Sequence, residues 1–313
     1  MADSSSSTVT DLISTVHQDI IEVHILTRLD GPTLASLSCA STLLHKLASN
    51  ELLWSKICRS TWPSTATISD DPRSFFSDVY SVLDTGGSVS DLDHPFPELI
   101  SAVDLHYRGK LILSRIVKTE TTTAWFLSSP LSIDLVDAKD TVETPIKRGR
   151  WTEDTCRDLE QDLTLSWIVI DPVVKRAANL SSHRPVSVQR NWLSGEVEAK
   201  FATVVGSVEC VITVVTCGEE MHVKEVSLKV EEMEGTSLNG KDSLVILRSV
   251  MEGKRGNGRR REAESKWRHE EFMEKKRELK EKKMRVEWVF DILTVAVGVL
   301  GFGTLVGFCL WSR

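Results

Sequence analysis

The sequence predicts an α+β protein with four parts in order: a small N-terminal three-helix module, a β-rich sandwich-like middle domain, a charged helix and a C-terminal transmembrane helix. Apolar residues recur at helical spacing before residue 62, and about eight short β-type runs follow between residues 100 and 250. The twenty residues before Ser312 carry no charge. Long helices do not alternate with the β-type runs, which argues against a Rossmann-type fold.

The composition is that of an ordinary globular protein with an uneven distribution of charge. Its 313 residues are 41% hydrophobic and 27% charged, and the net charge of −7 argues against nucleic-acid binding driven by overall charge. The segment Lys254–Arg285 holds 14 basic and 7 acidic side chains, so a basic stretch follows an acidic body. The six cysteines are scattered without a CxxC pair, which argues against a disulfide framework or a zinc ribbon.

These changes in pattern predict the domain boundaries. We expect a disordered polar N-terminus at 1–14, a helical module at 15–62, a linker with a short helix at 63–99, a β-rich domain at 100–252, a basic stalk helix at 253–288 and a transmembrane helix at 289–311. The start of the chain lacks the basic and apolar regions of a signal peptide, so we expect the body to lie in the cytosol.

The N-terminal module is predicted from the spacing of its apolar residues. Between Ile20 and Leu29 they form one helical face, which ends at Gly31-Pro32. Further leucines predict two short helices, and Asn50 is a cap residue for one more turn. The apolar content exceeds what three short helices can bury among themselves, so a partner or the following domain must cover part of it.

This module resembles an F-box over roughly residues 15–60. The resemblance rests on the stretches Asp19-Ile20-Ile21, His24-Ile25-Leu26-Thr27-Arg28-Leu29, Leu34-Ala-Ser-Leu37, Leu44-His-Lys-Leu47-Ala and Leu53-Trp54. The sequence departs from the usual pattern at Val16-His17, which replaces Leu-Pro, and at Leu44, where many members have Trp. The whole chain is similar to plant F-box proteins that have a Trp-containing C-terminal region.

The resemblance implies a non-catalytic substrate receptor of a Skp–cullin–F-box ubiquitin ligase. F-box helices dock on a Skp-family adaptor, which links them to a cullin, and the C-terminal domain recruits a protein substrate, here unknown. The residues that the resemblance assigns to the adaptor interface are Val16, Ile20, Ile21, Ile25, Leu26, Leu29, Leu34, Leu37 and Leu47. The alternative is a helical cap that packs only on its own chain.

The middle region is predicted to be an antiparallel sandwich or jelly roll. The expected strands are Leu111–Val117, Thr123–Leu127, Leu131–Leu135, Leu163–Ile170, Val197–Val204, Ser207–Val215, Val223–Val230 and Leu244–Val250. We expect Trp151, Trp167 and Trp192 in the core. The region resembles the phloem-lectin domains attached to some plant F-boxes, although no sugar-binding set carries over.

No catalytic, metal or cofactor site is predicted. The sequence lacks GxSxG, HExxH, a Walker loop and a GxGxxG after a strand. The eight histidines stand without metal-ligand spacing, and Cys210 and Cys217 are expected to be small buried apolar residues.

The C-terminal run predicts a single membrane span. Twenty apolar residues span about 30 Å as a helix, the thickness of a bilayer core. The residues that define the expected span are Ile292, Gly298, Gly303, Gly307 and Trp311. The Lys/Arg-rich flank on its N-terminal side predicts a tail anchor with the body in the cytosol, on a membrane that the sequence does not identify. A buried core helix is the alternative.

The leading hypothesis is therefore a membrane-tethered F-box receptor that contacts an adaptor, a protein substrate and membrane lipid, but not nucleic acid. We expect the basic stalk to be attracted to anionic headgroups. The alternative is a membrane-tethered protein-binding or lectin-like module without a ligase role.

Overall fold

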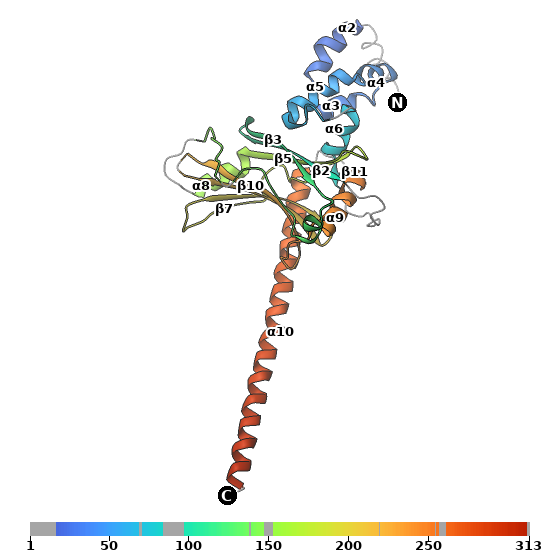
Figure 1. The fold of residues 1–313 in the computed structure, drawn as a ribbon. Coiled ribbons are helices and arrows are strands. Elements are labelled where there is room, and N and C mark those ends of the chain that lie inside the picture. The colour runs from blue at the N-terminus through green and yellow to red at the C-terminus, as the bar shows by residue number, and fades with distance from the viewer. Residues whose placement is uncertain are drawn as a thin grey trace, which may run out of the picture.

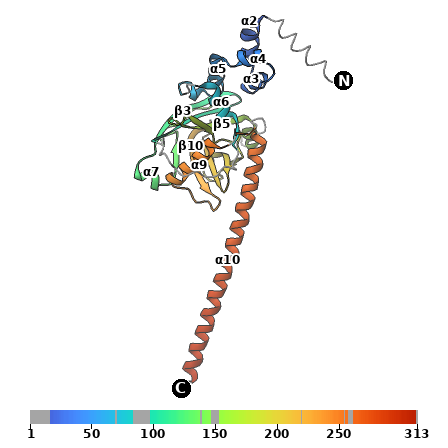
Figure 2. The ribbon, with the colours of Figure 1, turned by 90° about the vertical axis from the view of Figure 1, so that its right-hand side faces the viewer.

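The computed structural model describes residues 17–68, 71–83, 97–137, 139–146, 153–218, 220–253, 255–256 and 261–311. The predicted N-terminus 1–14, Val16 and Trp151 lie outside the described residues. A helical module, a two-sheet body and one long helix follow each other along the chain (Figure 1). The helical module and the C-terminal end of the long helix lie at opposite ends of the molecule in both views (Figures 1 and 2).

The helical module is longer than the sequence predicts. Its elements are α2 (Gln18–Ile20), η1 (Ile21–Ile25), η2 (Leu26–Arg28), α3 (Gly31–Leu37), α4 (Thr42–Ala48), α5 (Glu51–Thr61), η3 (Pro63–Thr65) and α6 (Pro72–Tyr80). The turn expected after Asn50 is the whole of α5, and the segment expected to be a linker holds η3 and α6. Helix α6 packs into the module, because its Phe75, Phe76 and Val79 belong to the core of the module.

Side-chain caps explain where these helices begin. Asp30 accepts a hydrogen bond from the Thr33 N–H at the start of α3, and Ser41 accepts one from the Leu44 N–H at the start of α4. Asn50 does the same for Leu52 in α5. Each cap satisfies a backbone donor that has no partner inside its helix.

The body consists of two antiparallel sheets. The five-stranded sheet has the order β4 (Ser132–Asp134), β10 (His222–Glu232), β9 (Val208–Cys217), β8 (Val197–Val205), β7 (Ser187–Arg190). The four-stranded sheet has the order β3 (Lys110–Glu120), β2 (Glu98–Tyr107), β5 (Leu163–Asp171), β6 (Arg176–Asn179). The short strands β1 (Val82–Leu83) and β11 (Arg255–Gly256) pair with each other.

The two sheets share one core, as expected of a sandwich. Trp167 and Leu165 of β5 pack in the same cluster as Phe201 of β8 and Ile212 of β9. Helix α8 (Glu153–Asp162) contributes Leu159 to this cluster. Trp167 is fully buried, as the sequence analysis expects, and its indole N–H donates to the Ser101 hydroxyl.

Two of the eight expected strands are helices instead. Residues 123–127 belong to α7 (Ala124–Ser128), which begins where the Thr123 side chain accepts a hydrogen bond from the Phe126 N–H. Residues 244–250 belong to α9 (Gly240–Glu252), capped by Asn239. Local capping and the apolar spacing of Leu244, Leu247 and Val250 favour a helix over an extended run.

Trp192 is likewise not in the core, which corrects the prediction. Its side chain is 90% exposed at the tip of the β7–β8 hairpin, next to Leu193. The Asn191 side chain accepts hydrogen bonds from the Leu193 and Ser194 N–H groups and so holds the loop in a turn. The turn carries both apolar side chains away from the sandwich.

The helical module packs on the outer face of the four-stranded sheet. Ile100 and Ala102 of β2 and Ile168 and Ile170 of β5 belong to the same cluster as the buried residues of the helices. These strands are therefore covered on both faces, which explains why β2 and β5 are buried along nearly their whole lengths.

Two buried carboxylates also connect the module to the sheet. Asp104 of β2 is fully buried and accepts hydrogen bonds from the Ser64 N–H at 3.0 Å, the Ser64 hydroxyl at 2.6 Å and the Ser114 hydroxyl at 2.7 Å. Asp78 of α6 pairs with Arg176 of β6 at 2.9 Å. Asp104 of the sheet thus contacts the module, and Asp78 of the module contacts the sheet.

The expected stalk and span form one continuous helix, α10 (Arg261–Trp311). Phe272 is buried against the body, and His269 contacts Glu209 of β9 at 2.5 Å. In the part of the chain that the structure describes, no helix combines the length and apolarity needed to cross a membrane. The side chains of 299–300 and 302–310, Gly303 and Gly307 included, lie outside that part.

The Asp104 contacts generate a prediction about stability. Asp104→Ala leaves the Ser64 N–H and two hydroxyls without their acceptor in a buried site, so we expect the free energy of unfolding to fall by about 3 kcal/mol. Chemical denaturation of the purified chain measures it. The exposed Asp134→Ala is the control, with an expected change within about 0.5 kcal/mol. Equal effects from the two variants would contradict the role given to Asp104.

Candidate functional site

The candidate site is an apolar surface on the helical module. Among the described residues of the module, 17–68 and 71–80, five large apolar side chains are exposed: Ile20, Val23, Ile25, Leu43 and Leu52. We call this set the exposed apolar surface. Ile20, Val23 and Ile25 lie in the first helical segment, which consists of α2, η1 and η2. Leu52 of α5 is 80% exposed. Several large apolar side chains left exposed on one small module are available for a partner to cover.

The first helical segment has an irregular backbone. The Leu26 N–H donates to the Ile21 carbonyl, five residues earlier, and the Leu29 N–H donates to the Leu26 carbonyl only three residues earlier. The Thr27 hydroxyl donates to the Val23 carbonyl at 2.6 Å. This change of helical pitch places Ile21 and Leu26 in the core while Val23 and Ile25 stay on the outside. Wide helical turns of this kind are frequent at functional sites.

The core of the module fixes the exposed apolar surface in place. The Trp54 indole N–H donates to the Ala48 carbonyl at 2.7 Å, and its ring lies 5.3 Å from the ring of Phe76. Phe76 in turn approaches Gly31 so closely that a Cβ at Gly31 would lie 2.1 Å from the ring. Only glycine fits at this first position of α3.

The structure divides the predicted interface residues into three groups. Ile20 and Ile25 are exposed, and Leu29 and Leu37 are partly buried. The remaining described residues are buried in the core of the module: Ile21, Leu26, Leu34 and Leu47. These four support the surface from inside, and their contact with an adaptor stays a prediction.

Sequence reasoning missed three members of the exposed apolar surface. Val23 lies one helical turn after Ile20, a spacing that could have placed it on the same side. Leu43 and Leu52 each precede a buried leucine, Leu44 and Leu53, in a Leu-Leu pair. Neighbouring residues of a helix point in different directions, so one member of such a pair faces solvent when the other is buried.

The described residues form no metal site, and the environments of their histidines and cysteines follow from burial and pairing. They contain no group of three His, Cys, Asp or Glu side chains that could hold a metal ion. His222 pairs with Glu220 at 3.0 Å on the surface, and burial lowers the pKa of His106. Burial raises the pKa of the Cys58 and Cys210 thiols to about 12, which keeps both protonated at neutral pH.

The cysteine environments predict a pattern of chemical labelling. In the native protein at pH 8, we expect maleimide to modify the exposed Cys39 quickly and to leave Cys58 and Cys210 unmodified, because a thiolate is the reactive form. Mass spectrometry of tryptic peptides measures the three rates, and labelling in denaturant is the control. Rapid native labelling of Cys210 would show that its strand is more open than described here.

The helical module and the chain as a whole both match known proteins. A family model described as F-box-like matches residues 21–60. A probable F-box protein of Arabidopsis thaliana is 81% identical over 309 residues, which cover 98% of this chain and 96% of its relative. Two further F-box proteins of Arabidopsis thaliana are 42% and 40% identical, covering 96% and 100% of this chain and 96% of each relative. No solved structure matches.

The family match covers Val23, Ile25, Leu43 and Leu52 of the exposed apolar surface, and the matches to the relatives extend over the sandwich and α10. The chain therefore belongs to the plant F-box protein family.

Proposed function

We propose that this chain is a non-catalytic substrate receptor of a Skp–cullin–F-box ubiquitin ligase. The exposed apolar surface binds a Skp-family adaptor, which connects the chain to a cullin, and the sandwich recruits a protein target for ubiquitination. The observation that carries the proposal is the exposure of Val23 and Ile25 on the segment that matches the F-box-like family, with the exposed Ile20 directly before it. Their burial by an adaptor removes apolar area from water and so favours binding.

The contacts between the helical module and the four-stranded sheet support the proposal that the module binds the adaptor and the sandwich recruits the target. The module is held on the sheet by a shared core and by the contacts of Asp104 and Asp78, so an adaptor bound to the module has a defined orientation relative to the sandwich. A receptor of this kind needs such an orientation, because the transfer of ubiquitin requires the target to lie at a fixed position in the complex.

The adaptor interface is tested with a single and a double variant of exposed apolar residues and a matched control. Ile25→Asp, alone or with Val23→Asp, places an unpaired charge in a contact that must be dry, so we expect adaptor binding to weaken at least about a hundredfold. Binding of a Skp-family adaptor to the full chain is measured by calorimetry. Leu111→Asp on β3, where the side chain is 46% exposed against 44% for Ile25, is the control and should bind normally.

Normal binding by Ile25→Asp would show that the exposed apolar surface is not the contact. If the unchanged chain fails to bind the adaptor, the ligase role itself is wrong. Because these two residues are exposed, the variants should keep the melting temperature of the unchanged chain, which separates a lost contact from a lost fold.

The same variants identify the target better than a truncation would. Deleting residues 1–62 would uncover Ile100, Ala102 and Ile168, which the module buries, and would so disturb the sandwich. Val23→Asp with Ile25→Asp keeps that cover and removes only the link to the ligase. Proteins that co-purify with this variant and accumulate in its presence are the expected substrates.

The proposal includes a tether to a membrane at the C-terminal end, with the body in the cytosol. Its support is the uncharged run of twenty residues from Ile292 to Trp311 and the basic flank that precedes it. The exposed charged turns of α10 that precede the run connect it to the body.

The tether is tested by fractionation. Removing residues 289–313 should move the protein into the supernatant after carbonate treatment of membranes, since the basic flank alone gives only salt-sensitive attraction. Val299→Arg should weaken insertion by about 2.5–3.5 kcal/mol, whereas Val299→Leu should not. Recovery of the unchanged chain in the carbonate supernatant would refute the tether and leave the adaptor role unaffected.

A further inference from the structure

One edge of the four-stranded sheet is long and open. The strand β3 lies at that edge and has 11 residues, whereas the other edge strands of the two sheets, β4, β6 and β7, hold only 3 or 4 residues each. In the part of the chain that the structure describes, β3 pairs with β2 and with no other strand. A long edge strand presents a row of backbone donors and acceptors to any extended chain that lies beside it, and most proteins keep such edges short.

The register of the β2–β3 ladder identifies the backbone groups of β3 that face outward. The Thr121 N–H donates to the Pro97 carbonyl, which continues the pairing of Glu120 with Glu98. Hydrogen-bonded and non-bonded pairs alternate along an antiparallel ladder. The odd-numbered residues 113–119 of β3 therefore exchange hydrogen bonds with β2, and the even-numbered residues between them face away from it.

The opposite side of β2 agrees with this alternation. The Arg108 N–H donates to the Asp162 carbonyl at 2.9 Å in continuation of the β2–β5 register, so the even-numbered residues of β2 bond to β5 and the odd-numbered ones bond to β3. The N–H and C=O groups of Ser114, Ile116 and Lys118 thus point out of the sheet. None of the described residues forms a hydrogen bond with these groups.

The side chains beside this open row suit a neighbouring strand. Ile116 is 42% exposed on the outer face of the sheet, and Val117 on the inner face is only partly covered by the sandwich core. The Arg115 guanidinium is directed to the body, where it donates to the Leu135 carbonyl at 2.6 Å. A strand that adds to β3 therefore gains apolar contacts on both of its faces.

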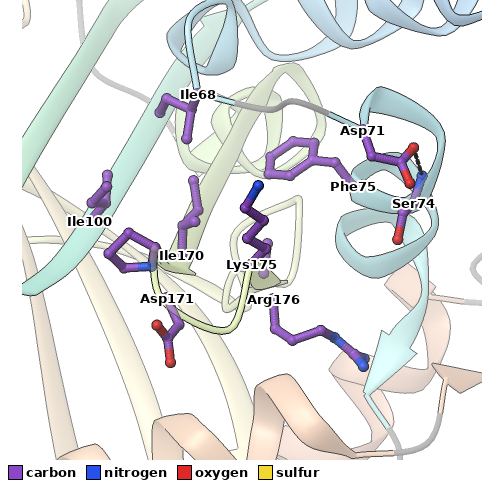
Figure 3. Close-up of a pocket in the computed structure, with 11 residues that line it drawn as sticks. Ile68, Asp71, Ser74, Phe75, Ile100, Ile170, Asp171, Lys175 and Arg176 are labelled. Atoms are coloured by element: carbon purple, nitrogen blue, oxygen red, sulfur yellow. Dashed lines mark hydrogen bonds between the residues drawn. The ribbon is translucent and has the colours of Figure 1, made fainter. Parts of the chain in front are cut away.

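The open row lies close to the helical module. Ile100, the ladder partner of Lys118, belongs to the core of the module and lines one cavity together with Ile68 and Phe75 (Figure 3). A chain segment that pairs with β3 is thus held beside the part of the molecule that carries the exposed apolar surface.

The charges of the edge strand disfavour a second copy of this chain as its occupant. β3 holds Lys110, Arg115 and Lys118 against Glu120, and the Lys118 ammonium lies 3.6 Å from the carboxylate of Glu98 on β2. Two copies of this strand placed side by side bring an excess of cations together, and like charges on neighbouring strands are destabilising. A segment without basic residues fits the edge better.

We propose that β3 captures an extended segment of the target protein, which joins the four-stranded sheet as a fifth strand. Backbone hydrogen bonds to Ser114, Ile116 and Lys118 supply the affinity, and apolar residues of the segment that lie opposite Ile116 and Val117 supply the selectivity. The assignment of this segment to a target rests on the receptor role proposed above, whereas the pairing itself does not.

The first measurement is amide hydrogen exchange in the full chain, followed by NMR. In the free chain, we expect the amides of Ile116 and Lys118 to exchange at least about tenfold faster than those of Arg115 and Val117. The probe is the peptide acetyl-Ser-Thr-Val-Val-Thr-Ser-amide, whose two valines can lie opposite Ile116 and Val117. At about ten times its Kd, the peptide should slow the exchange of the Ile116 and Lys118 amides about tenfold.

A matched pair of variants tests the backbone contact. Ile116→Pro removes an outward N–H and leaves the ladder to β2 intact, and Ile116→Val keeps that N–H in a residue of similar size. We expect the Kd of the peptide to rise at least about tenfold in Ile116→Pro and to stay within about twofold in Ile116→Val. Unchanged protection of the Arg115 and Val117 amides shows that the proline variant keeps β3 folded.

A modified peptide tests the pairing without any change to the chain. N-methylation of both valines blocks both edges of the peptide, so this form should bind at least about tenfold more weakly than the parent. The proposal is overturned if the parent peptide shows no saturable binding, if the outward amides keep their exchange rates at saturation, if Ile116→Pro binds as well as Ile116→Val, or if the methylated peptide binds as tightly as the parent.

Two further outcomes separate this proposal from its alternatives. If raising the concentration of the chain alone slows the exchange of the Ile116 and Lys118 amides, the edge pairs two copies of the chain and the proposal is overturned. If the unchanged chain fails to bind the adaptor, the receptor role and the assignment of the segment to a target are wrong, but none of the peptide readouts changes.

Discussion

The strands β2 and β5 of the four-stranded sheet are buried on both faces, and the arrangement of the whole molecule depends on this double burial. Alternate residues of β2 and β5 point to the sandwich core and to the core of the helical module. A strand in this position needs apolar residues on both sides, and the run Leu163–Ile170 has them. The two hydrophobic cores are thus joined through one sheet rather than separated by a linker.

Strands buried on both faces leave little room for polar side chains, and the buried Asp104 of β2 has defined partners. Asp104 lies on the face covered by the module, where Ser64 and Ser114 donate to it. Buried hydrogen bonds of this kind are directional, so they favour one docking of the module over the sliding that apolar contacts alone would allow. The orientation of the exposed apolar surface relative to the sandwich follows from these few contacts.

Local patterns predicted much of this fold, but not the contacts between its parts. The leucine spacing and the Leu53-Trp54 pair were enough to indicate the module, and the β-type runs indicated most of the sandwich. The stretch Leu244–Val250 is apolar enough for a buried strand or a helix, and the cap at Asn239 together with the spacing of Leu244, Leu247 and Val250 distinguishes them. Trp192 shows the same limit, since its apolar character indicates a core while Asn191 and Gly195 beside it indicate a turn.

The contacts between the module and the sheet could not be predicted from the sequence, because the residues that make them are far apart in it. Ser64 and Asp104 are separated by 40 residues, and nothing local to either indicates the other. In the same way, the irregular turns after Ile21 decide which apolar residues of the first segment face outward. The regular helical face expected from Ile20 to Leu29 includes Leu26, which is buried, and omits Val23.

The length of α10 gives the molecule a fixed reach. Among the described side chains of this helix, Phe272 is the last that is buried, and those from Arg277 to Gly298 are all exposed. At 1.5 Å per residue, the helix between Phe272 and Trp311 extends about 60 Å. Salt bridges one turn apart, such as Glu281 with Arg285, stabilise the free part as a rod. A partner that binds the C-terminal end of α10 is therefore held at a fixed distance from the sandwich. A protein bound beside that end does not reach the sandwich unless it extends along the helix by a similar length.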